Sequence, residues 1–233
     1  MSAFNSYRDA FFAPRRFSSD KWEHYFEIYD LLIGKYYGQA DVRYLEIGVQ
    51  GGGSLEVARS LLGERSAVYG LDIDPACRGL EAGGPADRIF IGSQVDAELI
   101  ARVSSEAGPF DIVIDDGSHV QQHMVATFLM LFPAVKQGGV YIIEDTHTNY
   151  FPTHQESFAG IGLYDYFKGL SERLNIDFMD PTLRQTRYKT PREQRPPMQV
   201  VRDIGRDIFS ISFFNSVIAI HKMTRAEPLR IRR

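Results

Sequence analysis

Five short apolar segments, rich in β-branched or aromatic side chains, follow one another along the first two thirds of the chain. They lie at residues 43–49, 67–73, 88–91, 110–115 and 140–144. Segments with the periodicity of helices stand between most of them, near residues 55–62, 97–103 and 121–131. Parallel strands need crossovers of this kind, which are nearly always right-handed. The alternation therefore predicts an α/β fold in which five parallel strands form a doubly wound, Rossmann-like sheet.

The residues before this alternation are predicted to belong to the same domain. Residues 1–40 hold an irregular, aromatic-rich segment and then a helical pattern at residues 22–37. Ser18, Ser19 and Asp20 stand just before that pattern and carry side chains that can cap a helix.

The regular alternation ends after residue 145, within a principal domain that we expect at residues 41–224. Residues 146–200 are interpreted as a mobile loop or lid, because residues 180–199 are rich in proline and arginine. Further predicted elements are a helix at residues 164–174, a closing antiparallel strand pair at 208–213 and 217–220, and a disordered basic tail at 225–233.

The composition excludes several classes of protein. A content of 44% hydrophobic and 24% charged residues is ordinary for a globular enzyme, and the net charge of −4 gives no reason to expect a nucleic-acid partner. No apolar run approaches the roughly 18 residues of a membrane span, and residues 1–16 lack the apolar core of a signal peptide. The single cysteine, Cys77, excludes an intrachain disulfide and fits a reducing compartment. We therefore expect a cytoplasmic protein with no membrane partner.

Acidic residues follow the fourth and fifth predicted strands. Asp115 and Asp116 end the first of these strands, and Glu144 and Asp145 end the second. The carboxyl ends of neighbouring parallel strands meet at one crevice, where ligands bind. Carboxylate oxygens are the ligands that a hard divalent cation prefers. The sequence therefore predicts a metal site, Mg²⁺ or another divalent cation, held by Asp116, Glu144 and Asp145.

His119 stands one short turn beyond these acids and is the candidate general base. A divalent metal can acidify and orient a hydroxyl, and a base can then remove its proton as it attacks a methyl group. Asp115 is expected to face the cofactor or to accept bonds from local backbone amides. His147 and Tyr150, in the loop after the fifth strand, are candidates for the acceptor pocket, and a surface position is the equal alternative. His123 is given no role.

A glycine-rich turn follows the first predicted strand. The candidate cofactor residues there are Glu46, Gly48, Gln50, Gly51 and Ser54, the last also a candidate helix cap. No register of this turn provides the glycine spacing of the dinucleotide fingerprint. A carboxylate at position 46 would repel a phosphate but attract a cation, so the turn favours S-adenosylmethionine, which carries a sulfonium and an ammonium, over NAD.

Asp72, at the end of the second predicted strand, is a candidate acceptor for the ribose hydroxyls of that cofactor. Two alternatives remain open for these acids. The turn at Glu46 can be an ordinary tight turn with a solvent-facing glutamate, and single aspartates often cap the ends of strands and helices.

Several of these segments resemble a known family. The stretches are VIDDGSH at residues 113–119, LFP at 131–133, IIEDTHT at 142–148, SDK at 19–21, YLEIGV at 44–49 and SFFNSV at 212–217. They are similar to the metal-dependent sugar O-methyltransferases of antibiotic biosynthesis, above all to the macrocin and mycinamicin deoxysugar methyltransferases. A looser resemblance exists to the cephalosporin-hydroxylase-like methyltransferases.

The resemblance implies a class I methyltransferase architecture, S-adenosylmethionine and Mg²⁺ as cofactors, and a homo-oligomer. By its motifs, Asp116, Glu144 and Asp145 fall on the family's metal ligands and His119 on its proposed base. The residues that fall on the family's cofactor pocket are Glu46, Gly48, Asp72 and the segment at Ser93 and Gln94.

These observations lead to one preferred function and one alternative. We expect Mg²⁺-dependent methyl transfer from S-adenosylmethionine to a hydroxyl of a deoxysugar on a glycosylated natural product, with His119 as the base. The alternative is an O-methyltransferase that acts on a non-sugar diol, a catechol or another small metabolite. A non-catalytic scaffold would have no need for a histidine beside three carboxylates suited to a metal.

Overall fold

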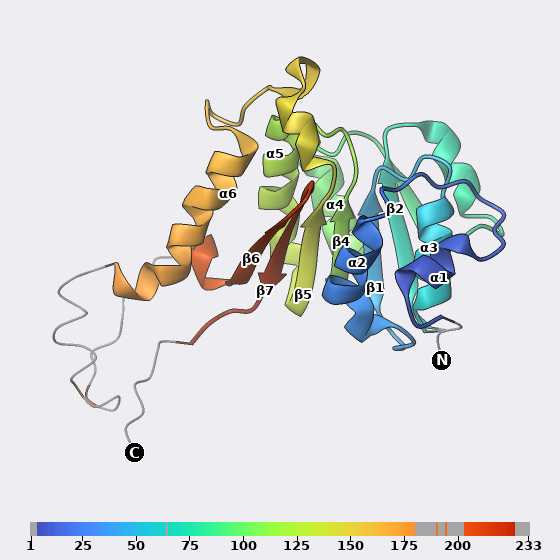
Figure 1. Cartoon of the computed structure of the whole chain (residues 1–233), viewed down its shortest axis with the longest axis horizontal. Helices are drawn as coiled ribbons and strands as arrows, with labels where there is room; N and C mark the ends of the chain where they lie inside the picture. The colour runs from blue at the N-terminus through green and yellow to red at the C-terminus, as the bar shows by residue number, and fades with distance from the viewer. Residues whose placement is uncertain (1–3, 64, 180–189, 191–193, 195–202, 227–233) are drawn as a thin grey trace.

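The computed structural model describes residues 4–63, 65–179, 190, 194 and 203–226 (Figure 1). The loop predicted at residues 180–199 lies almost wholly outside the described residues, as does the tail from residue 227. Arg225, which the prediction placed in a disordered tail, is held in place, because its guanidinium donates to the backbone oxygens of Leu174 and Gly205.

A seven-stranded sheet forms the centre of the molecule, in the order β3-β2-β1-β4-β5-β7-β6. Its strands are β1 (Arg43–Ile47), β2 (Ala67–Asp72), β3 (Arg88–Ile91), β4 (Phe110–Asp115), β5 (Val135–Ile143), β6 (Ile208–Phe214) and β7 (Val217–Lys222). The first five strands are parallel, and β7 pairs antiparallel with both β5 and β6. The predicted fold class, with its closing antiparallel pair, is confirmed, and it is the class I methyltransferase fold.

The fifth strand begins earlier than the sequence predicted. β5 already pairs with β4 at Val135, and the register then shifts before Val140 pairs with Ile112. Gly138 lies in this interval with a φ of 81°, a left-handed conformation that glycine adopts without a steric penalty. Gly138 and Gly139, which stand just before the strand predicted at residues 140–144, therefore form an irregularity within β5.

Helices cover both faces of the sheet, as the doubly wound prediction requires (Figure 1). The α-helices are α1 (Tyr7–Phe12), α2 (Tyr25–Ile33), α3 (Gly53–Leu61), α4 (Ala97–Ala107), α5 (Gln121–Leu131) and α6 (Leu163–Glu172). Short 3₁₀ turns lie at Gly34–Tyr36, Pro75–Leu80, Phe132–Ala134, Thr146–Tyr150, Pro152–His154, Arg173–Phe178 and Ile204–Arg206. Apolar residues of α1, α2 and α3 share one buried cluster, and those of α4, α5 and α6 share the other. Among the described residues, no helix has the length and apolar character that crossing a membrane requires.

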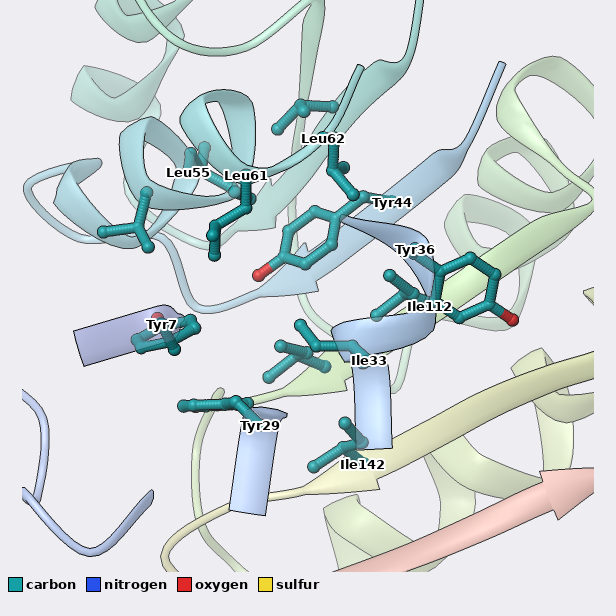
Figure 2. Packing of buried hydrophobic residues seen from close by; sticks show 14 of the residues in the cluster. Tyr7, Tyr29, Ile33, Tyr36, Tyr44, Leu55, Leu61, Leu62, Ile112 and Ile142 are labelled. Atoms are coloured by element: carbon teal, nitrogen blue, oxygen red, sulfur yellow. The ribbon is translucent and has the colours of Figure 1, made fainter. Parts of the chain in front are cut away.

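The cluster beneath α1 and α2 is rich in tyrosine (Figure 2). Tyr7 stacks on Tyr29 with ring centroids 4.3 Å apart, and both rings are buried. Tyr36 lies at the far end of the same layer, where its hydroxyl donates to the backbone oxygen of Gly138. Buried tyrosines need partners for their hydroxyl groups. The hydroxyl groups of this layer are therefore expected to bond polar atoms at the ends of the strands.

The chain before α2 runs across the carboxyl edge of the sheet instead of capping the helix. α2 begins after His24, whose side chain makes no capping bond, so the predicted cap at residues 18–20 is wrong. The backbone oxygen of Ser18 instead accepts a hydrogen bond from the amide of Gly53, at the start of α3. A Cβ at Gly53 would overlap that oxygen, so glycine is needed for this close crossing.

Candidate functional site

The acids predicted from the sequence do meet at the carboxyl edge of the sheet. The amide of Asp116 donates to the backbone oxygen of Ile47, and the amide of Glu144 donates to that of Asp115, both at 2.9 Å. The ends of β1, β4 and β5 are thereby tied side by side. This places the side chains of Asp116 and Asp145 close to each other at that edge of the sheet.

Asp116, His119 and Asp145 form the candidate metal centre. One ligand atom of each lies within 4.8 Å of the other two. Nε2 of His119 lies 3.8 Å from Oδ1 of Asp116 and 3.9 Å from Oδ2 of Asp145. His119 and Asp145 both have left-handed backbone conformations, with φ of 57° and 51°.

The donor set fits a divalent cation. Two carboxylate oxygens suit a hard ion such as Mg²⁺, which keeps further positions for water or substrate oxygens. Nδ1 of His119 is buried and has no hydrogen-bond partner among the described residues, so the ring is poised for a ligand or a substrate proton. Burial lowers the pKa of His119 more than the two neighbouring carboxylates raise it, which favours the neutral ring.

Glu144, the third predicted ligand, lies outside this group. Its side chain is buried, and its two oxygens accept bonds from the hydroxyl of Tyr29 and, at 2.7 Å, from Nζ of Lys21. Burial raises the pKa of Glu144 more than Lys21 lowers it. Glu144 also lines the cavity that contains Asp116, His119 and Asp145, and its assignment as a metal ligand stays a prediction.

Lys21 is the site residue that the sequence left without a role. Its ammonium lies between Asp116 and Glu144, and its side chain is only 5% exposed. Burial lowers the pKa of Lys21, but the two carboxylates outweigh burial and hold the pKa above its ordinary value. The sequence feature that could have identified Lys21 is its spacing. Lys21, Tyr25 and Tyr29 recur every four residues, which is the spacing of one helical face.

A cavity beside the metal centre corresponds to the predicted cofactor pocket. Its lining includes five predicted residues, namely Gly48, Gln50, Asp72, Ser93 and Gln94. A second cavity, under the crossing segment, is lined by Gln50, Gly51 and Ser54 together with residues 18–21. His123, which was given no role, also lines the first cavity, and its ring nitrogen lies 2.9 Å from the hydroxyl of Ser118.

The glycine turn is shaped by close backbone contacts. Gly48 has a φ of 80°, and a Cβ there would overlap the backbone oxygen of Asp116. Oδ2 of Asp72 accepts bonds from the amides of Val49 and Gln50, at 2.9 and 3.1 Å. Asp72 therefore fixes the turn as well as lining the cavity.

Glu46 lies beneath the turn and lines neither of these two cavities. Its carboxylate is buried and accepts bonds from the hydroxyls of Tyr44, at 2.6 Å, and Ser54. The alternative of a solvent-facing glutamate is therefore wrong, and burial raises the pKa of Glu46. Ser54 does not cap α3, because the helix begins at Gly53 and its N-cap is Gly52. The hydroxyl of Ser54 donates to Glu46 instead.

Asp115 points to the opposite face of the sheet from Glu46. Its oxygens accept bonds from the amide nitrogen of Gln94, at 3.1 Å, and from the hydroxyl of Tyr141, at 2.9 Å. Burial raises its pKa to about 7. Gln94 in turn accepts a bond from the amide of Ser118 at 2.7 Å, so Asp115 braces the turn that carries Asp116.

The two candidate acceptor residues lie in the 3₁₀ turn after Asp145. His147 packs edge-on against Trp22, with ring centroids 5.8 Å apart, and its Nδ1 lies 2.6 Å from the hydroxyl of Ser216. Tyr150 is 69% exposed and stacks on Tyr164. Trp22 also lines the cavity that contains Asp116, His119 and Asp145, so aromatic rings border the candidate centre.

Comparisons with known proteins find similarity to methyltransferases. Residues 45–146 match a family model described as a methyltransferase domain. The 8-demethyl-8-(2-methoxy-alpha-L-rhamnosyl)-tetracenomycin-C 3'-O-methyltransferase of Streptomyces olivaceus is 44% identical over 149 residues, which are 59% of this chain and 36% of that protein. The mycinamicin VI 2''-O-methyltransferase of Micromonospora griseorubida is 45% identical over 123 residues, which are 50% of this chain and 30% of that protein.

A solved structure is similar over nearly the whole chain. The MycE methyltransferase from the mycinamycin biosynthetic pathway, in complex with Mg, SAH and mycinamycin VI, is 30% identical with a TM-score of 0.71. The similarity covers 94% of this chain and 53% of that one. The chain thus spans about a third of the length of the curated relatives and about half of the solved chain.

Proposed function

We propose that this chain, whose methyltransferase domain is similar to the sugar O-methyltransferases of antibiotic biosynthesis, methylates a hydroxyl of a deoxysugar on a glycosylated natural product, with S-adenosylmethionine as donor. The observation that carries this proposal is the convergence of Asp116, His119 and Asp145 beside the cavity over the glycine turn. The relatives named above act, by their names, on rhamnosyl tetracenomycin and on mycinamicin.

The donor is proposed to lie along the first cavity. Gly48 lets the ligand approach the backbone closely, and Asp72 and Gln50 stand at the end of β2 and in the turn that faces it. Asp116 lines this cavity and also belongs to the metal centre. The transferable methyl group and the acceptor hydroxyl would therefore meet at Asp116.

Asp116 and Asp145 are proposed to hold the divalent cation, with Mg²⁺ as the natural choice for oxygen ligands. When bound, the metal would lower the pKa of the acceptor hydroxyl and orient it. His119 is proposed as the base: imidazole is an uncommon ligand for Mg²⁺, and burial lowers the pKa of the His119 ring, which favours its neutral form. The hydroxyl oxygen forms the new bond to the methyl carbon, the bond from that carbon to sulfur breaks, and His119 takes the proton.

The test is release of S-adenosylhomocysteine with Mg²⁺ and a defined set of acceptors. Mycinamicin VI and rhamnosyl tetracenomycin serve as glycosylated acceptors, and their aglycones and catechol serve as comparisons. Turnover with a glycosylated acceptor, and its loss in EDTA, would support the proposal. Turnover with catechol alone would favour the non-sugar alternative. The absence of turnover with every acceptor tested would reject both functions.

A homo-oligomer is also proposed, on the resemblance to the sugar methyltransferases. Light scattering coupled to size-exclusion chromatography measures the mass of the particle in solution. A mass equal to that of one chain, at concentrations of tens of micromolar, would contradict this assignment.

A further inference from the structure

We propose that Tyr25 is a positioning residue for the candidate metal centre. This inference rests on the proposed function, since it concerns the cation that Asp116 and Asp145 would hold. It comes from the helical face of α2 and the residues just before it, where Lys21, Tyr25 and Tyr29 stand four residues apart.

Each member of this face contacts at least one acid. Nζ of Lys21 bonds Asp116 and Glu144, and the hydroxyl of Tyr29 donates to Glu144. The hydroxyl of Tyr25 donates to Oδ1 of Asp145 at 2.6 Å. The N-terminal part of the chain therefore reaches three of the four acids at the ends of β4 and β5, namely Asp116, Glu144 and Asp145.

The division of oxygens between these contacts is what distinguishes Tyr25. Asp145 gives Oδ1 to Tyr25 and turns Oδ2 toward His119. Asp116 likewise gives Oδ2 to Lys21 and turns Oδ1 toward His119. Glu144 lines the same cavity and gives its two oxygens to Lys21 and Tyr29.

Tyr25 is itself fixed by a second contact. Its hydroxyl lies 2.8 Å from Oγ of Ser216, and the same Oγ lies 2.6 Å from Nδ1 of His147. Ser216 stands in the turn between β6 and β7 with a left-handed φ of 63°. The Tyr25 hydroxyl therefore links the 3₁₀ turn at His147 to the carboxylate of Asp145.

The hydroxyl orients Asp145 by a bond to the oxygen that faces away from the cation. Without that bond, the carboxylate of Asp145, which carries a strained backbone, can rotate, and metal affinity should fall. Partners of this kind typically change metal affinity by about ten- to a hundredfold.

The experiment measures Mn²⁺ binding to the protein without donor or acceptor, by electron paramagnetic resonance titration. The variants are Tyr25→Phe and, as a control for hydroxyl loss in the same tyrosine layer, Tyr36→Phe. We expect the Mn²⁺ dissociation constant to rise about tenfold or more in Tyr25→Phe and to stay within about twofold in Tyr36→Phe. Melting temperatures of all variants are compared, so that a folding defect is recognised.

The outcomes separate this inference from the proposed function. Wild-type protein that binds no Mn²⁺ would remove the metal from the proposed function. Wild-type binding with unchanged affinity in a folded Tyr25→Phe would overturn the positioning role alone. Equal weakening in Tyr25→Phe and Tyr36→Phe would also overturn it, because it would trace the loss to the tyrosine layer and not to the contact with Asp145.

Discussion

His119 and Asp145 share an unusual backbone conformation although neither is glycine. Their φ values of 57° and 51° lie in the left-handed region, which costs of order 1–3 kcal/mol for each such residue. This conformation turns both side chains back over the strand ends, where they meet Asp116. A purely structural turn would be more stable with glycine at these positions, so the cost is consistent with a functional arrangement.

Asp116→Asn should separate metal-dependent catalysis from donor binding. The amide keeps the shape of the side chain but loses the charge that attracts a cation, so Mg²⁺-stimulated turnover should fall by about a hundredfold or more. The affinity for S-adenosylhomocysteine, measured by calorimetry, should change by less than about threefold, because the glycine turn and Asp72 remain intact. Equal losses of turnover and donor affinity would contradict this division.

His119→Ala should lower turnover by about two to four orders of magnitude, the usual contribution of a general base. Donor affinity should be retained, since His119 lies among the residues of the metal-centre cavity and not among those lining the donor cavity. The measurement is the single-turnover rate at saturating donor, acceptor and Mg²⁺. A variant that reacts at nearly the wild-type rate would remove His119 from the reaction.

The sequence predicted where the acids gather, but not which of them face one another. Asp116, His119 and Asp145 could be anticipated because they follow the ends of adjacent parallel strands. Glu46 and Asp115 were assigned to the cofactor, yet their side chains lie buried on opposite faces of the sheet. Successive residues of a strand point to opposite faces, so the side on which each acid emerges depends on register and turn geometry.

At the scale of elements, the strands and the helices that follow them were predictable from periodicity, whereas the path of the N-terminal segment was not. The helix predicted at residues 164–174 is present as α6 (Leu163–Glu172). Residues 16–21, in contrast, cross the carboxyl edge through long-range contacts, such as the amide of Phe17 to the carboxylate of Glu56 at 3.0 Å. Contacts between segments so distant in the chain leave no periodic pattern in the sequence.

Gly53→Ala should destabilise the protein by about 1–3 kcal/mol, because the new methyl group overlaps the backbone oxygen of Ser18 and pushes the crossing segment away. Urea denaturation measures this free energy of unfolding. Gly169→Ala is the matched control, since a Cβ there meets nothing within 4 Å in the helix α6. The control should be neutral or stabilised by up to about 1 kcal/mol, and an equal loss in both variants would reject the overlap.

His221 makes the strand β7 sensitive to acid. Burial lowers the pKa of His221 below 6.5, and Lys35 lowers it further. The unfolded chain therefore binds a proton at a higher pH than the folded chain does, so the protein loses stability as the pH falls below about 6.5. His221→Gln should lose less stability between pH 7.5 and 5.5 than the wild type, as measured by melting temperature. Parallel curves for the two proteins would contradict this prediction.

At the scale of the whole molecule, the two buried clusters on either face of the sheet hold the strand ends in register, and the donor cavity and the metal centre open on the same edge. Lys21 and Tyr25 tie the N-terminal helices to that edge through the acids. The centre is therefore assembled from residues nearly 200 positions apart, from Lys21 to Ser216. A ligand that binds at this edge should therefore stabilise the folded state of the whole domain.

S-Adenosylhomocysteine should therefore raise the melting temperature of the protein in the absence of any acceptor. A ligand at a hundred times its dissociation constant stabilises the folded state by about 2.7 kcal/mol. For a domain of about 200 residues, each kcal/mol corresponds to about 2–4 °C, so the expected rise is roughly 5–10 °C. NAD at the same concentration is the control and should leave the melting temperature unchanged, since the turn lacks the glycine spacing of the dinucleotide fingerprint. A shift with NAD and none with S-adenosylhomocysteine would show that the cavity over Gly48 and Asp72 serves a different cofactor.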